Sequence, residues 1–153
     1  MTRVEDVIEI DASTSSIWKV LVDPSYIPKL FPDIITAEMD PPGMITRNSR
    51  AKVYGRIGKI RFEIFLEFPR LDTEVCLESR QLPGGLFSLF SQRVTLEPIG
   101  LETRVRSSFE YDFVPEYAAG VTDLASLDRT VTNNLHAYMH NLKEICELLP
   151  LPS

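Results

Sequence analysis

The chain is poor in the residues that hold metal ions or cross-link secreted domains. It has 153 residues, of which 2 are cysteines and 2 are histidines. Cys76 and Cys146 lie far apart, with no CxxC motif and no Cys/His cluster between them. A structural disulfide is the alternative, but isolated thiols of this kind are typical of a reducing compartment. We therefore predict two reduced thiols in a cytoplasmic protein that carries no cofactor.

Basic residues and long apolar runs are also scarce. The 16 Lys and Arg residues face 22 Asp and Glu residues, so the formal net charge is −6. Nucleic-acid binding draws its affinity from clustered Lys and Arg, so no nucleic-acid partner is expected. No apolar run approaches the roughly 18 residues of a membrane span. The opening MTRVEDVIEIDAS has acids where a secretory signal needs an apolar region. The length predicts one domain over residues 1–153.

The apolar pattern predicts one strand, two short helices, six strands and one long helix. Val4–Ile10 alternates as a strand, Ser13 offers a helix N-cap, and Asp23-Pro24 ends that helix. Ser25–Phe31 supplies a second short helix. A period of two then predicts strands over Ile34–Met39, Ile45–Tyr54, Ile60–Phe68, Glu74–Leu82, Phe87–Glu97 and Leu101–Phe113. Gly55 and Gly58 are interpreted as bracketing a tight turn. A helical period predicts the last helix over residues 116–149.

This order predicts an α+β fold of the helix-grip type. A curved, seven-stranded antiparallel sheet would surround the C-terminal helix, with the two short helices placed between strands one and two. Turn residues at hairpin spacing favour an antiparallel meander. One helix fills the concave side of such a sheet incompletely, so we expect a hollow. Hollows with a mainly apolar lining and a few polar groups are where small molecules bind.

We predict that the inward faces of the strands and the long helix line this hollow. Each apolar residue taken alone is better explained by a plain core. Polar residues in the same rows favour a pocket, because an unpaired buried hydroxyl or amide is costly and needs a protein, water or ligand partner. The predicted ligand-binding residues are Arg47, Ser49, Val53, Phe62, Ile64, Leu77, Ser79, Phe90, Gln92, Val105, Ser107, Phe109, Tyr111, Leu127 and Val131.

No set of residues forms a catalytic or metal-binding signature. His136 and His140 have a spacing that can hold zinc, but the glutamate of H-E-x-x-H and a third ligand are missing, so we predict that both face solvent. Nucleophile elbows, phosphate loops and dinucleotide-binding fingerprints are also missing from the sequence. An enzyme would need an acid or base within hydrogen-bond range of its substrate. Arg47, Tyr54 and Tyr111 are the candidates, and nothing in the sequence brings them together.

Three stretches of the sequence resemble a known superfamily. ASTSSIWKVLVDPSYIPKLFPDI, LEPIGLETRV and NNLHAYMHNLKEICEL are similar to START/Bet v 1-like (SRPBCC) helix-grip proteins, nearest to the polyketide cyclase/dehydrase, coenzyme Q-binding and CoxG-like branch. The most specific parts are the Trp-x-x-Leu-x-Asp-Pro element at residues 18–24 and the Phe-Pro at residues 31–32. The resemblance implies a fold whose members bind lipids, quinones, sterols, hormones or polyketides, while some catalyse cyclisation or dehydration. Function inferred from a fold alone is analogy.

The resemblance and the expected hollow together imply binding or carriage of an apolar small molecule, such as a lipid, a quinone or a polyketide-like compound. The alternatives are a cyclase/dehydrase-type enzyme using the same hollow, or a protein-interaction module. The mouth would lie near the two short helices, with Tyr26, Phe31 and the Pro83–Phe90 hairpin as a lid. The exposed apolar residues that would support transient docking of this hairpin to a membrane or a donor protein are Leu86, Phe87, Leu89 and Phe90.

Overall fold

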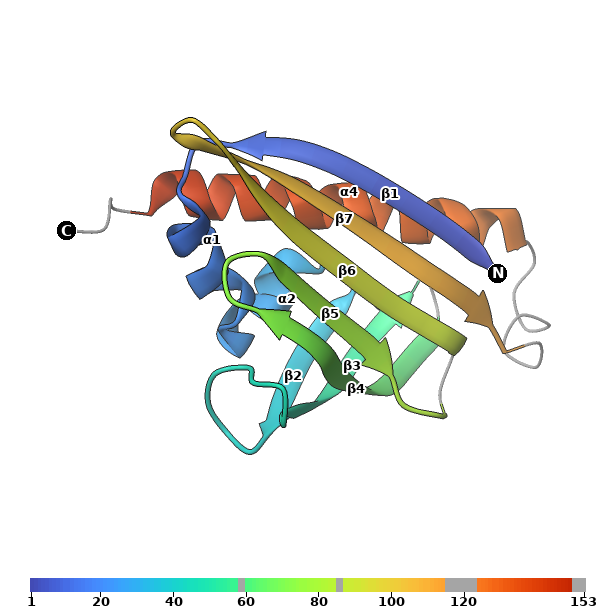
Figure 1. Ribbon diagram of the computed structural model, residues 1–153. Coiled ribbons are helices and arrows are strands. Elements are labelled where there is room, and N and C mark those ends of the chain that lie inside the picture. The colour runs from blue at the N-terminus through green and yellow to red at the C-terminus, as the bar shows by residue number, and fades with distance from the viewer. Residues whose placement is uncertain (58–59, 85–86, 115–123, 150–153) are drawn as a thin grey trace.

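One curved antiparallel sheet and a long helix dominate the computed structural model, which describes residues 1–57, 60–84, 87–114 and 124–149. The elements are β1 (Thr2–Ile10), α1 (Thr14–Leu21), the 3-10 turn η1 (Pro24–Tyr26), α2 (Ile27–Leu30), β2 (Ile34–Asp40), β3 (Arg50–Ile57), β4 (Ile60–Asp72), β5 (Cys76–Gln81), β6 (Phe87–Ile99), β7 (Glu102–Phe113) and α4 (Leu124–Leu148). The seven strands are ordered β1-β7-β6-β5-β4-β3-β2 (Figure 1). The predicted α+β helix-grip fold is confirmed.

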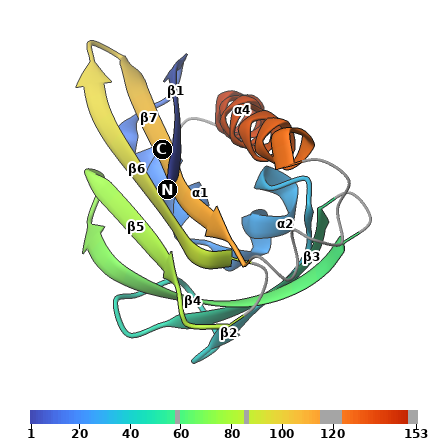
Figure 2. The same ribbon diagram turned by 90° about the vertical axis from the view of Figure 1, so that its right-hand side faces the viewer.

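The sheet bends around α4 and α2, which both lie on its concave side (Figure 2). The main contacts of α4 are with β1, β7, α1 and α2, so this helix sits over the β1 edge of the sheet. The face of α4 turned to the sheet carries Val131, Leu135, Tyr138 and Leu142, all of them buried. Helical spacing of three and four residues places these side chains on one stripe, as the sequence predicts.

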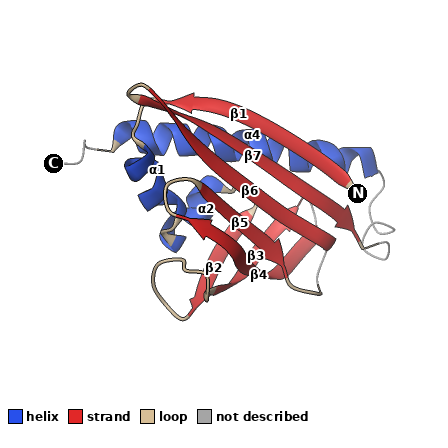
Figure 3. Ribbon diagram, viewed as in Figure 1, coloured by secondary structure: helices blue, strands red, loops and turns tan. Residues whose placement is uncertain are grey.

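Side-chain caps mark the start of α1, as predicted at Ser13, and the start of the η1 turn that leads into α2. The Ser13 hydroxyl accepts a hydrogen bond from the Ser16 amide at 3.1 Å and caps α1. The Asp23 carboxylate accepts from the Ser25 amide at 3.0 Å and caps η1. Both caps start a helix, and the break between α1 and η1 at residues 22–23 lets the chain fold back under the sheet before β2 begins (Figure 3).

The buried apolar residues form two clusters. The larger joins α1, α4, β1, β6 and β7 and includes Ile17, Val105 and Leu135. The smaller joins α2, β3 and β4 and includes Ile27 and Val53. The two clusters share partly buried residues, among them Phe31 and Phe62, so they adjoin each other on the concave side of the sheet.

The predicted strands differ from the structure chiefly around β3 and β4. The strand expected from Ile45 begins at Arg50, because the Ser49 hydroxyl accepts from the Thr46 amide at 2.9 Å and closes a turn there. Gly55 lies inside β3, paired with Phe62, so its interpretation as a turn residue is wrong. The strand expected to end at Phe68 runs on to Asp72, through a register shift after Glu67. Gly58 and residues 116–123 of the expected last helix lie outside the described residues.

Candidate functional site

An apolar cavity of about 100 Å³ lies where the two clusters meet. One water molecule needs roughly 10–15 Å³ on this scale, so the cavity is larger than a packing defect. Its walls come from the short helices, the inner face of β3 to β7 and α4. The described aromatic side chains that line it are Phe31, Phe62, Phe68, Phe87, Phe90, Phe109 and Tyr138. A space of this kind suits an apolar molecule better than a cluster of waters.

The structure brings about half of the sequence-predicted ligand-binding residues together around this cavity. Those that line it are Phe62, Ile64, Leu77, Ser79, Phe90, Gln92, Phe109 and Val131. Others are buried in the core without appearing in the lining, namely Ser49, Val53, Val105, Ser107, Tyr111 and Leu127. The alternation of these strands predicts the inward face correctly, but only part of that face borders the open space.

The three residues considered as catalytic candidates do not converge. Arg47 was expected on a strand, but β3 begins only at Arg50. Arg47 therefore lies exposed on the turn before that strand and does not line the cavity. Tyr54 alternates with the buried Val53 and sits under the Lys52 ammonium, 5.0 Å from the ring centroid. The Tyr111 hydroxyl donates to the Asp128 carboxylate at 2.7 Å, and burial together with that carboxylate raises the pKa of Tyr111. Tyr111 therefore stays a neutral donor held by its own partner.

Two polar residues of the lining, Asp33 and Asn134, were not foreseen from the sequence. Asp33 directly precedes β2, and the Asn134 side-chain amide on α4 donates a hydrogen bond to its carboxylate. The Asp33 backbone carbonyl accepts from the Arg56 amide at 2.8 Å, which fixes this segment against β3. Burial raises the pKa of Asp33, and the Asn134 hydrogen bond opposes that rise. No local sequence signal links two residues so far apart in the chain.

A second polar group joins the lining residue Gln92 to Ser107 behind it. The Gln92 side-chain amide donates to the Ser107 hydroxyl at 3.1 Å, and both residues are buried. Burial raises the pKa of Tyr138, while its contact with Gln92 acts in the opposite direction. The Tyr138 ring packs against Phe31 with a centroid distance of 4.5 Å. The Gln92 amide and the Ser107 hydroxyl therefore satisfy each other. Neither needs a ligand as a partner in order to be buried stably.

The apolar hairpin expected at the surface is partly buried. Phe87 is 3% exposed and packs against the Phe90, Tyr111 and Phe113 rings. A register shift between Phe87 and Leu89 turns both Phe87 and Phe90 inward, which simple alternation does not predict. The expectation of an exposed Phe87 is therefore wrong, and Leu89 and Phe90 are half-buried. Leu86 lies outside the described residues.

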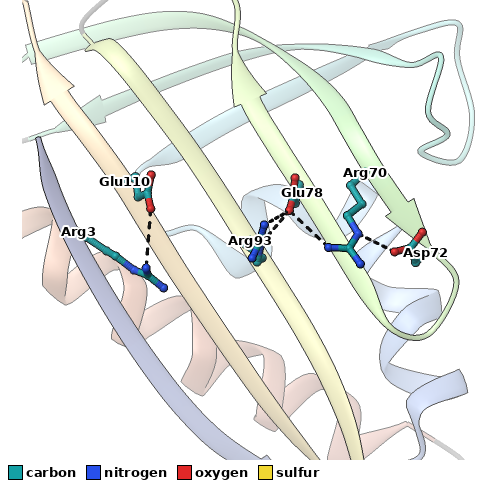
Figure 4. Close-up of polar contacts among 6 residues, drawn as sticks. All are labelled: Arg3, Arg70, Asp72, Glu78, Arg93 and Glu110. Carbon is teal, nitrogen blue, oxygen red and sulfur yellow. Dashed lines mark hydrogen bonds and ion pairs between the residues drawn. The ribbon is translucent and has the colours of Figure 1, made fainter.

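A second depression, of about 300 Å³, lies on the outer face of the sheet. Its lining includes Arg3, Glu78, Arg93 and Glu110, which pair with one another or with Arg70 (Figure 4). Glu78 lies 2.6 Å from Arg93 and 4.0 Å from Arg70, and Arg3 lies 3.9 Å from Glu110. This depression is larger than the inner cavity, but its charged side chains are already paired with one another in a solvated setting. Such pairs leave little for a ligand to bind. The inner cavity is the candidate site.

The two histidines face solvent, as predicted. His136 Nδ1 lies 2.8 Å from an Asp6 carboxylate oxygen, and His140 Nε2 lies 2.9 Å from Glu144 on the next turn of α4. Both histidines are more than half exposed, with side-chain exposures of 55% and 66%. His136 thus joins α4 to β1, His140 contacts its own helix, and neither residue lines the cavity.

Both cysteines are unpaired and buried, which agrees with the predicted reduced thiols. Burial raises the pKa of the Cys146 thiol to about 12, so it is a thiol rather than a thiolate near neutrality. Across the described residues, every helix is too short or too polar to span a bilayer.

Comparison with known proteins agrees with the fold and adds a family. Residues 1–147 match the family model described as polyketide cyclase / dehydrase and lipid transport. No curated protein sequence gives a significant match.

Several solved structures share the fold. An aromatase/cyclase from a Streptomyces species superposes with a TM-score of 0.79 at 15% identity, covering 95% of this chain and 93% of its own. A START superfamily protein from Mycobacterium smegmatis gives 0.76 at 15% identity, covering 97% and 99%. Norcoclaurine synthase from Thalictrum flavum, solved with dopamine and hydroxybenzaldehyde, gives 0.67 at 20% identity, covering 94% and 85%. At these identities the likeness shows the fold alone.

Proposed function

This chain belongs to the polyketide cyclase / dehydrase and lipid transport family, and from that membership and the cavity we propose that it binds and carries an apolar small molecule. The observation that carries the proposal is the space between sheet and helix, whose described lining is mostly aliphatic and aromatic. Burying an apolar molecule there removes its surface from water at about 25 cal/mol per Å². Lipids, quinones and polyketide-like compounds all fit this chemistry.

Among these, the aromatic lining favours a ligand that contains rings. Phe31, Phe109, Phe90 and Phe87 form a continuous series along the cavity, with centroid distances of 6.4, 5.3 and 5.0 Å between successive rings. Aromatic pairs contribute about 0.5–1.5 kcal/mol beyond the area that they bury. A planar ligand can contact several of these rings at once, whereas a flexible acyl chain loses more conformational freedom on binding.

The first test is occupancy of the cavity by a neutral fluorescent probe, N-phenylnaphthylamine. Wild-type protein should bind the probe with a rise in its emission. Val131→Trp places a large side chain in the lining and should abolish the rise, whereas Val7→Trp adds the same side chain at a 41% exposed position on β1 and should not. Undiminished binding by Val131→Trp, or no binding by the wild type, would contradict the proposal. Native mass spectrometry of fresh protein should reveal an apolar molecule that co-purifies.

A cyclase/dehydrase-type enzyme in the same cavity is the second candidate. Asp33 supports it, because an acid whose pKa is raised by burial suits proton transfer better than an ordinary surface aspartate. The two functions differ in what leaves the cavity. A carrier releases its co-purified compound chemically unchanged after incubation, and Asp33→Asn does not alter the compound. An enzyme converts the compound, and Asp33→Asn slows the conversion.

A further inference from the structure

Asp33 is the feature of the cavity that the binding of an apolar molecule does not explain. It is half-buried and lines a space whose other polar groups in the described lining are the uncharged Ser79, Gln92, Asn134 and Tyr138. Among the described lining residues none is a lysine, arginine or histidine. A carboxylate placed against apolar walls without a cation is costly, so a purely structural cavity would be more stable without it.

The position of this carboxylate is fixed by the backbone on both sides. The Asp33 carbonyl accepts from the Arg56 amide at 2.8 Å, and the Ile34 amide donates to the Phe31 carbonyl at 3.2 Å. The Asn134 amide donates to the carboxylate from α4. Arg56 is exposed, and its guanidinium is not among the groups that shift the pKa of the Asp33 carboxyl. Asn134 lies one helical turn before Tyr138, and both face the cavity.

This geometry offers a ligand an acceptor and no cation. Resting on the function proposed above, we propose that Asp33 and Asn134 are the polar recognition point of the cavity, which selects ligands whose head group donates a hydrogen bond and rejects those that end in a carboxylate or phosphate. A hydroxyl or a protonated amine can donate to the carboxylate. An anionic head group meets a like charge in a poorly solvated space with no basic side chain to offset it.

The test is a head-group series on one ring system: naphthylmethanol, naphthylmethylammonium, naphthoate and methylnaphthalene, substituted at the same ring carbon. Each is titrated into the full chain at neutral pH by displacement of N-phenylnaphthylamine. A hydrogen bond to a charged group is worth about tenfold or more in affinity. Wild-type protein should therefore bind the alcohol and the ammonium about tenfold or more tightly than naphthoate.

Asp33→Asn tests the same point from the protein side, and Asp40→Asn is its control. The control removes the same charge from an exposed position at the end of β2, the strand that Asp33 precedes. With Asp33→Asn the ammonium should lose about tenfold in affinity and naphthoate should gain, while methylnaphthalene changes little. The alcohol should lose less, because the new amide oxygen still accepts. Asp40→Asn should leave all four affinities unchanged.

The outcomes separate this inference from the function on which it rests. The recognition point is overturned if the wild type binds naphthoate and the alcohol equally, or if the ranking is unchanged in Asp33→Asn. In either case, binding of methylnaphthalene would still support the proposed binding of apolar molecules in the cavity. If the wild type binds neither the probe nor any of the four compounds, the proposed function fails as well. The preference of the wild type for the ammonium over naphthoate decides the matter by itself, because both head groups are charged and both lose hydration on binding. The test therefore holds even if Asp33→Asn does not fold.

Discussion

Replacing Gly55 by alanine should damage stability and ligand binding together. Gly55 lies in β3 opposite Phe62 of β4. A Cβ at this position would stand 2.2 Å from the Asp33 carbonyl oxygen and 2.4 Å from Cζ of Phe62. Neither distance is tolerable for non-bonded atoms, so the segment before β2 or the Phe62 ring must move. Both Asp33 and Phe62 line the cavity, so any such movement changes its shape.

The size of the effect follows from three contributions. Overpacking a filled site costs about 1–3 kcal/mol. Displacing the Asp33 carbonyl weakens its 2.8 Å hydrogen bond from the Arg56 amide, a contribution of about 0.5–1.5 kcal/mol. Alanine loses less backbone entropy than glycine on folding, which offsets about 0.4–1 kcal/mol. The net loss in free energy of unfolding should be about 2 kcal/mol.

Urea denaturation followed by Trp18 fluorescence measures the first effect, and N-phenylnaphthylamine titration measures the second. Gly100→Ala is the control: Gly100 has a φ of 61° and an added Cβ would meet no atom within 4 Å. Its cost is backbone strain alone, about 1–2 kcal/mol, and its probe affinity should equal that of the wild type. The reasoning is refuted if Gly55→Ala keeps both wild-type stability and wild-type probe affinity.

Three further predictions concern the core, the buried acid and a thiol. Leu135→Ala removes a side chain that is 0% exposed and should lower the free energy of unfolding by about 2–5 kcal/mol in urea; a loss below that range would mean that α4 collapses into the gap. Because the pKa of Asp33 is raised in the folded state, its contribution to stability is complete at pH values below the pKa of an unfolded aspartate and is lost as the pH rises through the folded value. Urea unfolding across that window should therefore show a smaller fall for Asp33→Asn than for the wild type, and parallel curves would contradict the shift. Cys146, with a pKa of about 12, should react with iodoacetamide at pH 8 far more slowly in native protein than in urea, as read by mass spectrometry of the labelled peptide; equal rates would contradict its burial.

The fold could be predicted because its signals are local. The Ile60–Phe68 alternation gives the strand one buried face and one solvent-exposed face, and the Ser13 cap fixes the start of α1. The spacing of Val131, Leu135, Tyr138 and Leu142 defines the buried stripe of α4. Each signal spans only a few residues, so secondary-structure periodicity and turn spacing are enough to order the elements.

The site could be predicted only in part, because its geometry depends on long-range contacts and on breaks in alternation. The shift between Phe87 and Leu89 reverses the phase at the start of β6. Gly55 is a glycine because Asp33 and Phe62 approach it closely, a reason that no turn pattern reveals. The pairing of Asp33 with Asn134 joins a loop to a helix across most of the chain. Such contacts exist only once the sheet has curved.

The anchoring of α4 explains why the hollow persists instead of closing. On one side the Lys143 ammonium donates to the Glu9 carbonyl of β1 at 2.9 Å, and the Glu147 carboxylate accepts from the backbone after that strand at 2.8 Å. On the other side the Asn141 amide donates to the Leu30 carbonyl at the end of α2 at 3.1 Å. These contacts hold α4 at a fixed distance above the concave face of the sheet. The helix cannot move toward β4 and β5 without breaking these side-chain-to-backbone hydrogen bonds on both sides, so the space beneath it stays open.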